Sequence, residues 1–326
     1  MAILVTGGAG YIGSHTVKYL KAQKEEVVVL DNLIKGHKEA IKDTCFYQGD
    51  IRDDGLIDKI CQEHNIAGVV HFAAYSLVGE SMKDPLKYYE NNVAGSLELI
   101  KSLVRNKVPS IVFSSTAAVY GEPEKVPIKE TDKTLPTNPY GETKLAIERM
   151  LKWAYEAHGL NSVSLRYFNA AGADPEGEIG EDHNPESHLI PIILGVALGQ
   201  REKITVFGDD YQTPDGTCVR DYIHVMDLAS AHYLALKKLQ TTTGALAYNL
   251  GNGEGFSVKE VIETAREVTS HPIPQELGSR RPGDPAVLVA SQLKAQEELG
   301  WERKYSSLKQ IIADAWHWHK NHPNGY

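Results

Sequence analysis

Four glycines fall within seven residues near the N-terminus, in the segment Gly7-Gly8-Ala9-Gly10-Tyr11-Ile12-Gly13. A short apolar run typical of a β-strand precedes this segment, and a helical pattern follows it. Glycines at Gly7, Gly10 and Gly13 allow a tight turn, a close approach of the backbone to a pyrophosphate, and close packing of helix on sheet. The segment therefore predicts a dinucleotide-binding turn between the first strand and the first helix. The alternative is a glycine-rich turn with no ligand.

Short apolar runs alternate with helical patterns through the first half of the chain. Strands are expected near residues 3–5, 27–30, 45–47, 69–72, 111–114 and 162–166, and helices near residues 12–22, 55–63, 85–105 and 140–158. This alternation is typical of a parallel sheet with helices on both faces, whose strands are continuously apolar. We therefore predict an α/β protein with a doubly wound parallel Rossmann sheet and a smaller α+β substrate-binding domain.

The composition of the chain changes after about residue 172. Residues 173–187 are rich in Gly, Pro, Asp, Glu and Asn, which predicts a long loop of the kind that often carries function. A later helix and strand are expected to return to the first domain. We expect a dinucleotide-binding domain of residues 1–172 and about 222–251, and a second domain of residues 173–221 and 252–326.

The charge and the cysteines limit the partners and the compartment of the protein. A net charge of -9 argues against a general nucleic-acid surface, which needs clustered Lys and Arg. Cys45, Cys61 and Cys218 are widely spaced and odd in number, as expected for reduced thiols. No basic leader follows Met1, and the longest apolar stretch, residues 189–198, is too short to span a bilayer. We expect a cytoplasmic protein that binds neither nucleic acid nor membrane.

Two aspartates follow predicted strands at the edge where a dinucleotide would bind. Asp31 ends the second strand, 18 residues after Gly13, where a carboxylate accepts hydrogen bonds from an adenosine ribose and repels a 2′-phosphate. This position favours NAD over NADP, although the pair Asp31-Asn32 could instead form a turn. Asp50, after the third strand, could reach an adenine edge or have a purely structural role.

Tyr140 and Lys144 form a Tyr-x-x-x-Lys pair on a predicted helix, where both side chains lie on one face and reach the same ligand. A free phenol titrates at about 10. A nearby ammonium and a cationic nicotinamide ring would both lower that pKa, which would make Tyr140 a usable base. Thr116 ends the run Ser114-Ser115-Thr116 at the carboxyl end of the fifth strand, on the same edge as the glycine turn. We expect the three side chains to converge on a substrate alcohol.

Further segments match one family over essentially the whole chain. They are Thr6–His15, Val78–Ser81, Tyr88–Asn92, Phe113–Thr116, Val119–Gly121, Arg166–Asn169, Asp215–Asp227 and Arg280–Asp284. With these motifs the chain resembles the UDP-galactose 4-epimerase family of extended short-chain dehydrogenases/reductases. The last two segments lie far from the cofactor motifs and distinguish this family from its relatives.

The resemblance implies an enzyme that interconverts UDP-galactose and UDP-glucose at C4. Tyr140 would remove the proton from the sugar 4′-hydroxyl while hydride moves from C4′ to NAD⁺, and the 4-keto intermediate would turn and take the hydride back on its other face. Lys144 would tune Tyr140 and hold the nicotinamide ribose, and Thr116 would hydrogen-bond the reacting oxygen. NAD would stay bound through each cycle. The family also implies a homodimer through the helices at residues 85–105 and 140–158.

The resemblance assigns contacts in both domains. Cofactor contacts fall on Gly7, Gly10, Tyr11, Ile12, Gly13, Asp31, Asn32, Asp50, Ile51, Phe72, Ala73, Ala74, Asn91, Tyr140, Lys144 and Phe168. Contacts of the nucleotide-sugar-binding domain and of the reacting sugar fall on Thr116, Asn169, His188, Leu189, Thr205, Val206, Phe207, Arg220, Arg281, Asp284 and Leu288. Arg220 and Arg281 would pair with the diphosphate, unless they are ordinary surface arginines.

Four positions bear on substrate and chemistry. Thr116 stands where many members have Ser, which keeps the hydroxyl, and Ser76 stands where some have a cofactor-binding Lys. His188 replaces an Asn beside the sugar pocket. Leu288, eight residues after Arg280, stands where a Tyr would fill the space of an N-acetyl group. The pocket would then also admit UDP-N-acetylgalactosamine and UDP-N-acetylglucosamine, unless Leu288 is a core residue.

Other functions compete with this one. A 4,6-dehydratase would have an Asp-Glu pair where this chain has Ala117-Ala118, so elimination of water is not expected. An enzyme acting on a uronic acid would need a further cation, which the sequence leaves open, and a non-catalytic NAD-sensing protein usually lacks the Tyr or the Lys of the pair. His317, His319 and His322 suggest a metal, but side chains two apart on a helix point in different directions, so no metal site is expected.

Overall fold

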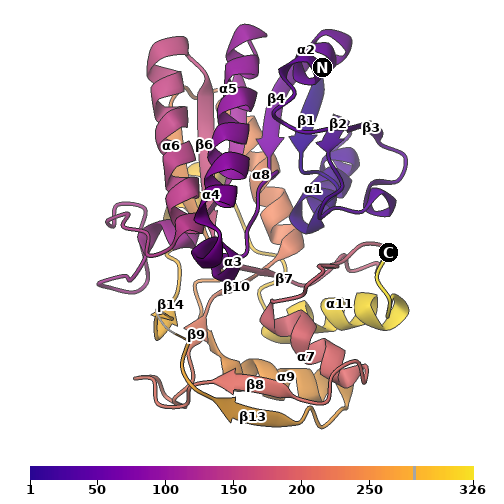
Figure 1. The fold of residues 1–326 in the computed structure, drawn as a ribbon, viewed down its shortest axis with the longest axis vertical. Helices are drawn as coiled ribbons and strands as arrows, with labels where there is room; N and C mark the ends of the chain where they lie inside the picture. Colours follow the sequence, from indigo (N-terminus) through magenta and orange to yellow (C-terminus); the bar gives the residue numbers. More distant parts are fainter. Residues whose placement is uncertain (282–283) are drawn as a thin grey trace.

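A seven-stranded sheet forms the larger part of the computed structural model, which describes residues 1–281 and 284–326 (Figure 1). All seven strands are parallel and follow the order β11-β6-β5-β4-β1-β2-β3. The strands are β1 (Ala2–Thr6), β2 (Glu26–Asp31), β3 (Cys45–Gln48), β4 (Ile66–His71), β5 (Ser110–Thr116), β6 (Asn161–Tyr167) and β11 (Ala245–Leu250). The order runs outward from β1 in both directions, so the predicted doubly wound α/β fold is confirmed.

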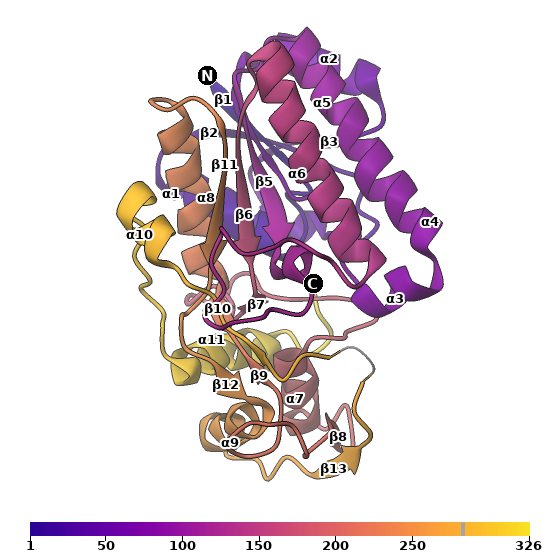
Figure 2. The same cartoon turned by 90° about the vertical axis from the view of Figure 1, so that its left-hand side faces the viewer.

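Helices cover both faces of this sheet (Figure 2). On one face lie α1 (Tyr11–Ala22) and α8 (Val225–Leu239), and on the other lie α2 (Asp54–His64), α5 (Gly95–Arg105) and α6 (Pro139–His158). The shorter helical segments of this lobe are η1 (Lys38–Ile41), α3 (Val78–Lys83), α4 (Pro85–Tyr88), η2 (Tyr89–Ala94) and η3 (Ala117–Tyr120).

The central strand β1 shows how the sequence produces two layers. Ile3 and Val5 belong to the core beneath α1 and α8, whereas Ala2 and Leu4 belong to the core beneath α2, α5 and α6. All four residues are buried. Because successive side chains of a strand point to opposite faces, a strand covered on both sides must be apolar at every position.

A π-helical segment divides the single helix expected at residues 85–105. The chain continues from α4 through the π-helix η2 into α5. The buried side chain of Asn92, within η2, accepts a hydrogen bond from the Tyr75 N–H (2.8 Å) and donates to the Tyr75 carbonyl oxygen (3.0 Å) and the Thr143 hydroxyl (3.1 Å). Segments of this kind often occur at functional sites. Here the segment connects the chain after β4 to α6.

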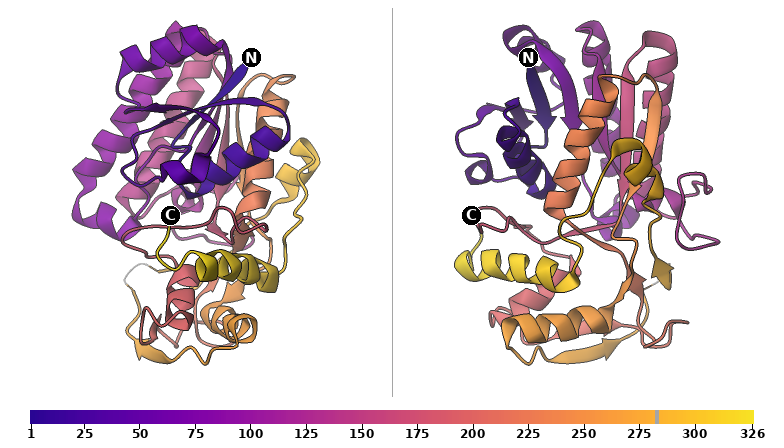
Figure 3. Two further views of the ribbon diagram at one scale, coloured as in Figure 1. Left: turned by 90° about the vertical axis from the view of Figure 1, so that its right-hand side faces the viewer. Right: turned by 180° about the vertical axis from the view of Figure 1, so that it is seen from behind.

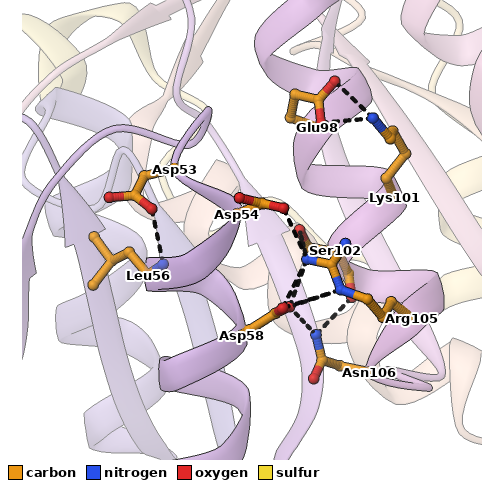
Figure 4. A network of polar contacts seen from close by, with 9 residues as sticks. All are labelled: Asp53, Asp54, Leu56, Asp58, Glu98, Lys101, Ser102, Arg105 and Asn106. Carbon is orange, nitrogen blue, oxygen red and sulfur yellow. Dashed lines mark hydrogen bonds and ion pairs between the residues drawn. The ribbon is translucent and has the colours of Figure 1, made fainter.

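Polar side chains connect α2 to α5 at the protein surface (Figure 4). The Arg105 guanidinium contacts the Asp58 carboxylate at 2.8 Å and Asp54 at 3.4 Å, and the Asn106 amide donates to the same Asp58 carboxylate. The Arg105 side chain is 45% exposed, so water screens these charges. The packing of α5 therefore depends mainly on its apolar face.

A smaller lobe lies beneath the sheet in the view of Figure 1. It contains three small sheets, β10–β7, β12–β9–β14 and β13–β8, and a core formed mainly by α7, α9 and α11. The remaining elements of the chain are β7 (Asn169–Ala171), α7 (Leu189–Ala197), β8 (Ile204–Phe207), β9 (Val219–Arg220), β10 (Tyr222–His224), β12 (Phe256–Ser257), α9 (Val258–Thr269), β13 (Gln275–Gly278), β14 (Val287–Leu288), α10 (Leu293–Leu299) and α11 (Leu308–Asn321).

Two apolar segments of the second half of the chain pack in different cores. The longest apolar stretch folds as α7 inside the core of the smaller lobe. Within the described ranges, no helix is long and apolar enough to cross a membrane. By contrast, α10 returns to the large sheet (Figure 3), where Leu299 and Trp301 pack with α8 and β11. The Trp301 indole N–H donates to the carbonyl oxygen of Asp227 at 2.9 Å.

We predict that two substitutions near the end of α5 differ sharply in cost. Leu103 is fully buried, so Leu103→Ala should lower the free energy of unfolding by about 2–5 kcal/mol, as cavities in a packed core do. Arg105→Ala removes an exposed ion pair and should cost less than about 1 kcal/mol. Urea denaturation of both variants measures the difference. Equal costs would show that the polar contacts, rather than the apolar face, hold α5 in place.

Candidate active site

The glycine turn joins β1 to α1 with no space for side chains at two of its positions. Gly7 has a φ of +71°, and a Cβ atom there would lie 2.5 Å from the backbone nitrogen of Ala73. A Cβ atom on Gly13 would lie 2.2 Å from the carbonyl oxygen of Gly7. The N-cap residue of α1 is Gly10, which has no side chain to cap the helix. The first backbone N–H groups of α1 are therefore free to bind an anion. The turn therefore fits a dinucleotide pyrophosphate.

Residues at both ends of the turn fix its position. The Tyr11 hydroxyl donates to the carbonyl oxygen of Gly172 at 2.7 Å, which joins the turn to the start of the long loop. Ile12 packs against the core beneath α1. The backbone N–H groups of Phe72 and Ala73 both donate to the Thr6 carbonyl oxygen, at 2.9 and 3.2 Å, so the chain leaving β4 lies against the turn, with Ala74 next in sequence.

Asp31 has the role of a turn residue in the structure. One carboxylate oxygen accepts the Ala9 N–H (2.9 Å) and the other accepts the Leu33 N–H (2.8 Å), while Asn32 accepts the Ile34 N–H (3.1 Å). Burial raises the pKa of Asp31, and these backbone donors oppose the rise. Each carboxylate oxygen has a further lone pair, so the turn and the predicted ribose contact are compatible.

Three further predicted cofactor contacts have partners within the protein. Asp50 forms a two-point ion pair with Arg52, at 2.8 Å for both Nε–Oδ1 and Nη2–Oδ2, and this pairing lowers the pKa of Asp50. Ile51 is buried against the start of α5. Asn91, in the π-helix, donates to the Asn92 side chain at 3.0 Å.

Thr116, Tyr140 and Lys144 meet where β5 ends and α6 begins. The Lys144 ammonium donates to the carbonyl oxygen of Ser114 at 2.8 Å and lies 5.9 Å from the centre of the Tyr140 ring. The Thr116 hydroxyl accepts the Ala118 N–H at 3.1 Å and lies near enough to Tyr140 to affect the pKa of the phenol. Asn138 caps α6 by accepting the Gly141 N–H at 2.9 Å, which fixes the helix start beside β5. The structure brings the three side chains to one place, and their convergence on a substrate alcohol stays a prediction.

Burial shifts the two titrating groups of this site in opposite directions. It raises the pKa of Tyr140 to about 12, and the nearby Thr116 side chain acts against this rise. It lowers the pKa of Lys144 to about 7, and the carboxylate of Glu148 one helical turn away acts against this fall. At neutral pH, burial therefore leaves the phenol of Tyr140 neutral and the amine of Lys144 partly protonated, and the protonated form of Lys144 favours the phenolate.

A buried polar network behind this site was not predicted from the sequence. Glu148 accepts two hydrogen bonds from Arg166, at 3.0 and 2.6 Å, and one from the Ser115 hydroxyl at 2.5 Å. Arg166 also donates to the Tyr120 hydroxyl at 2.9 Å, which in turn donates to Asn249 at 2.7 Å. The network joins α6 to β5, β6 and β11. The spacing of Glu148, four residues after Lys144, was the one visible signal.

Most of the predicted substrate residues of the smaller lobe lie on strands of two separate small sheets and on the segment between β13 and β14. β14 pairs with β9, which places Leu288 opposite Arg220, and Arg220 forms an ion pair with Asp284. The Arg281 guanidinium lies 4.1 Å from the centre of the Phe207 ring on β8.

Three further predicted residues have partners of their own. Val206 is buried, Thr205 donates to Glu276 at 3.0 Å, and the Asn169 amide donates to the Asp221 carbonyl oxygen at 3.1 Å. Leu288 and Phe168 both pack against a small cluster that includes Val119 and Tyr120 of η3. Leu288 therefore lies close to the segment that follows Thr116.

His188 and Leu189 lie at the start of α7. Leu189 packs against the core of the smaller lobe, whereas the His188 ring faces the carboxylates of Glu181 and Glu186 at 2.8 and 3.0 Å. Burial would lower the pKa of His188, but these carboxylates, Glu181 above all, raise it to about 10. The predicted role of His188 beside the sugar is not tested by this geometry.

Residues 3–251 match the NAD dependent epimerase/dehydratase family. The chain therefore belongs to this family, whose cofactor is NAD. It is similar to the UDP-glucose 4-epimerase of Halalkalibacterium halodurans, with 66% identity over 326 residues that cover 100% of this chain and 98% of that protein.

Two solved structures are similar over the full length of the chain. One is a UDP-glucose 4-epimerase with a TM-score of 0.98 and 57% identity, covering 100% of this chain and 99% of that one. The other is the UDP-glucose 4-epimerase of Bifidobacterium longum in complex with NAD⁺ and UDP, with a TM-score of 0.95, 40% identity and 100% of both chains covered.

We predict that the network behind the site stabilises the fold. The side chains of Glu148 and Arg166 are each only 9% exposed, and Glu148→Gln leaves the buried arginine without its charge partner. Breaking a buried pair in this way should lower the free energy of unfolding by about 3–5 kcal/mol. Glu156→Gln, at an exposed position of the same helix, is the matched control and should have little effect. Urea denaturation distinguishes them, and equal stabilities would contradict a structural role of the pair.

Proposed function

We propose that the chain is an NAD-dependent epimerase that interconverts UDP-glucose and UDP-galactose at C4 through a 4-keto intermediate. One observation carries the proposal: Thr116, Tyr140 and Lys144 converge beside a glycine turn that has no room for side chains. The full-length similarity to UDP-glucose 4-epimerases supports the same activity.

Each group of residues at the site would have a separate role in the reaction. The glycine turn, Asp31 and the N-terminus of α1 would hold NAD, which when bound accepts and returns a hydride. Tyr140 would take the proton of the sugar 4′-hydroxyl and return it at the end of the cycle. Thr116 would hydrogen-bond the same oxygen, and Lys144, held by the carbonyl oxygen of Ser114, would supply the charge that favours the phenolate.

The smaller lobe would bind the nucleotide part of the substrate. Arg220 and Arg281 are the cations expected to contact the diphosphate, as a planar guanidinium pairs well with phosphate oxygens. Arg220 is already paired with Asp284, so the diphosphate would share or replace that partner. The structure of the Bifidobacterium longum relative in complex with NAD⁺ and UDP supports a UDP site in this fold.

The rival functions receive less support. Ala117 and Ala118 form the start of η3 and carry no group that transfers a proton, which disfavours a dehydratase. A non-catalytic NAD-sensing protein would not need the Tyr140–Lys144 pair. An epimerase for uronic acids would need a further cation beside the sugar, and the two arginines of the smaller lobe are already assigned to the diphosphate.

We also propose a homodimer through the helices of the larger lobe. Several large apolar side chains are exposed there: Met82 on α3, Leu86 on α4, Leu97 on α5 and Trp153 on α6, at 61, 77, 42 and 68%. An apolar surface of this kind is typical of an interface between protein chains. Because α5 and α6 pack against each other, a partner chain could contact Leu97 and Trp153 together.

The organisation of the chain and its compartment remain proposals as well. We propose an NAD-binding domain of residues 1–172 and about 222–251, and a nucleotide-sugar-binding domain of residues 173–221 and 252–326. Residues 293–301 are the exception within 252–326: α10 and Trp301 pack on the large sheet, so we assign this segment to the NAD-binding domain. The three free cysteines support the cytoplasm as the compartment.

The direct test is an assay with UDP-galactose and purified protein, without added NAD. We predict that chromatography will show UDP-glucose as the product and that denatured protein will release NAD(H) and no NADP, because the Asp31 carboxylate repels a 2′-phosphate. A reaction that starts only when NADP is added would contradict the assignment.

Tyr140→Phe should leave the fold and the bound NAD intact but lower kcat by about 10²–10⁴-fold, since it removes the group that transfers the proton. Tyr155→Phe, on the same helix, is the matched control and should keep normal turnover. Steady-state kinetics and the NAD content of each variant measure both effects. Near-normal turnover of Tyr140→Phe would refute the role of the phenol.

Leu288 is proposed to set the width of the sugar pocket, because it packs beside Phe168 and η3. The enzyme should then also convert UDP-N-acetylgalactosamine. Leu288→Tyr should reduce kcat/KM for the N-acetylated substrate relative to UDP-galactose by roughly tenfold or more, since overpacking penalises the larger sugar. Leu277→Tyr, at an exposed position of β13, is the control. An unchanged ratio in Leu288→Tyr would assign the pocket width to another residue.

A further inference from the structure

Four side chains of the loop between β7 and α7 converge on one point. They are Glu181, His183, Glu186 and His188, and one ligand atom of each lies within 4.8 Å of all the others. The Nδ1 atoms of His183 and His188 lie 3.0 and 2.8 Å from the same Glu181 oxygen. The same two nitrogens lie 3.8 and 3.0 Å from the Glu186 carboxylate. All four residues come from a stretch of eight.

The carboxylate at the centre of this cluster is buried. The side chain of Glu181 is 4% exposed, and its charge partners in the described part of the chain are the two histidines alone. A buried carboxylate needs a compensating positive charge. Two arrangements can supply it here: a protonated histidine, or a cation held by all four side chains.

The number of side chains that face inward suits a cation better than a single ion pair. A tetrahedral Zn²⁺ with bonds of about 2.0–2.2 Å has neighbouring ligand atoms about 3.3–3.6 Å apart. The four nitrogen-to-oxygen separations in the cluster are 2.8, 3.0, 3.0 and 3.8 Å, so an ion at the centre would move three of these pairs apart by at least about 0.3–0.5 Å. A single ion pair needs one histidine and one glutamate, whereas here two imidazoles and two carboxylates face inward. Imidazole and carboxylate are both common zinc ligands.

A second group of acidic side chains differs from this cluster because a lysine already lies at its centre. Asp174, Glu176 and Glu178 also lie close together, but each accepts a hydrogen bond from the ammonium of Lys18, at 2.8, 2.7 and 2.8 Å. The Lys18 ammonium already occupies the point where the three carboxylates meet, so this group is no candidate. The cluster at residues 181–188 contains no lysine and no arginine.

We propose that Glu181, His183, Glu186 and His188 form a structural zinc site. Four protein ligands close the coordination sphere, which is typical of a structural rather than a catalytic zinc. This departs from the expectation of no metal, which considered the histidines of the C-terminal helix and not those of the loop. His188, expected beside the sugar, is thereby assigned to the metal.

The site lies where three distant parts of the chain meet. The Tyr11 ring of the glycine turn stands edge-on to His183, with 6.2 Å between ring centres. Asp182 contacts His37, which follows β2, and accepts the backbone N–H of Tyr326 at 3.1 Å. A zinc ion there would fix the loop that runs from the cofactor turn to α7. Its loss should therefore loosen the contact between the two lobes.

Metal content of the untagged, full-length protein is the test. After dialysis against metal-free buffer, we expect about one zinc per chain by mass spectrometry, as a closed four-ligand site retains its metal. His183→Asn and His188→Asn should lose it, and His158→Asn, at an exposed position of α6, should keep it. Exchange for Co²⁺ should give the visible absorption of a tetrahedral ion in the unmodified protein, which tests the site even if a variant fails to fold.

Thermal unfolding gives a second readout that does not depend on activity. Adding Zn²⁺ to the metal-free protein should raise Tm by roughly 2–4 °C or more, because a ligand bound only by the folded state stabilises it. The same addition should leave Tm of His188→Asn unchanged. Zinc well below one per chain, with no tetrahedral cobalt spectrum and no shift of Tm, would show that the cluster is an ion pair and overturn the proposal. The activity assay with UDP-galactose is separate, so either result leaves the proposed reaction to its own test.

Discussion

The contact between the Gly7 position and the backbone at Ala73 fixes the geometry on which the site depends. It lies where the strand order reverses, between β1 and β4, and it brings the start of α1 against the chain that leaves β4. A side chain at Gly7 or Gly13 would force these segments apart. The Asp31 carboxylate binds the same turn through the N–H of Ala9, so the second strand is held to it as well. The edge of the sheet that would bind the cofactor is thus defined by backbone contacts, and backbone contacts tolerate little variation.

The reactive side chains depend on a second constraint, which is the position of α6 against the sheet. Lys144 is held by the carbonyl oxygen of Ser114, and Glu148 on the same helix is held by Arg166 of β6. Because both contacts are buried, moving the helix would leave a buried charge unpaired, at a considerable cost. The phenol of Tyr140 is therefore placed by charges that it does not itself contact. The buried contacts of Lys144 and Glu148 therefore position α6 against the sheet, although its opposite face exposes Trp153.

The sequence predicted the elements whose cause is local and missed those whose cause is distant. Apolar periodicity and the glycines identified the strands of the large sheet, the helices on its faces and the Tyr140–Lys144 pair. The π-helix at residues 89–94 follows from the amide of Asn92 reaching Tyr75 and Thr143, a contact that no local pattern reveals. The strands of the smaller lobe are only two to four residues long, too short for a periodic signal. The partners Glu148 and Arg166, 18 residues apart in sequence, are joined only by the sheet.

The smaller lobe shows how an acidic chain can hold an acidic ligand. Its two predicted phosphate-binding arginines do not lie free in solution, because Arg220 is paired with Asp284 and Arg281 is stacked on Phe207. Both contacts limit the rotamers of the long side chains, so less conformational entropy is lost when a diphosphate arrives. The Asp284 carboxylate would then repel the phosphate unless it turns toward a hydrogen-bond donor of the ligand. A ligand with a diphosphate and a nearby hydroxyl could pair with Arg220 through the diphosphate and donate a hydrogen bond to Asp284 through the hydroxyl. Inorganic diphosphate has no such hydroxyl, so its charge would repel the Asp284 carboxylate. If Arg220 binds the diphosphate as proposed, its pairing with Asp284 would favour a nucleotide sugar over a simple anion.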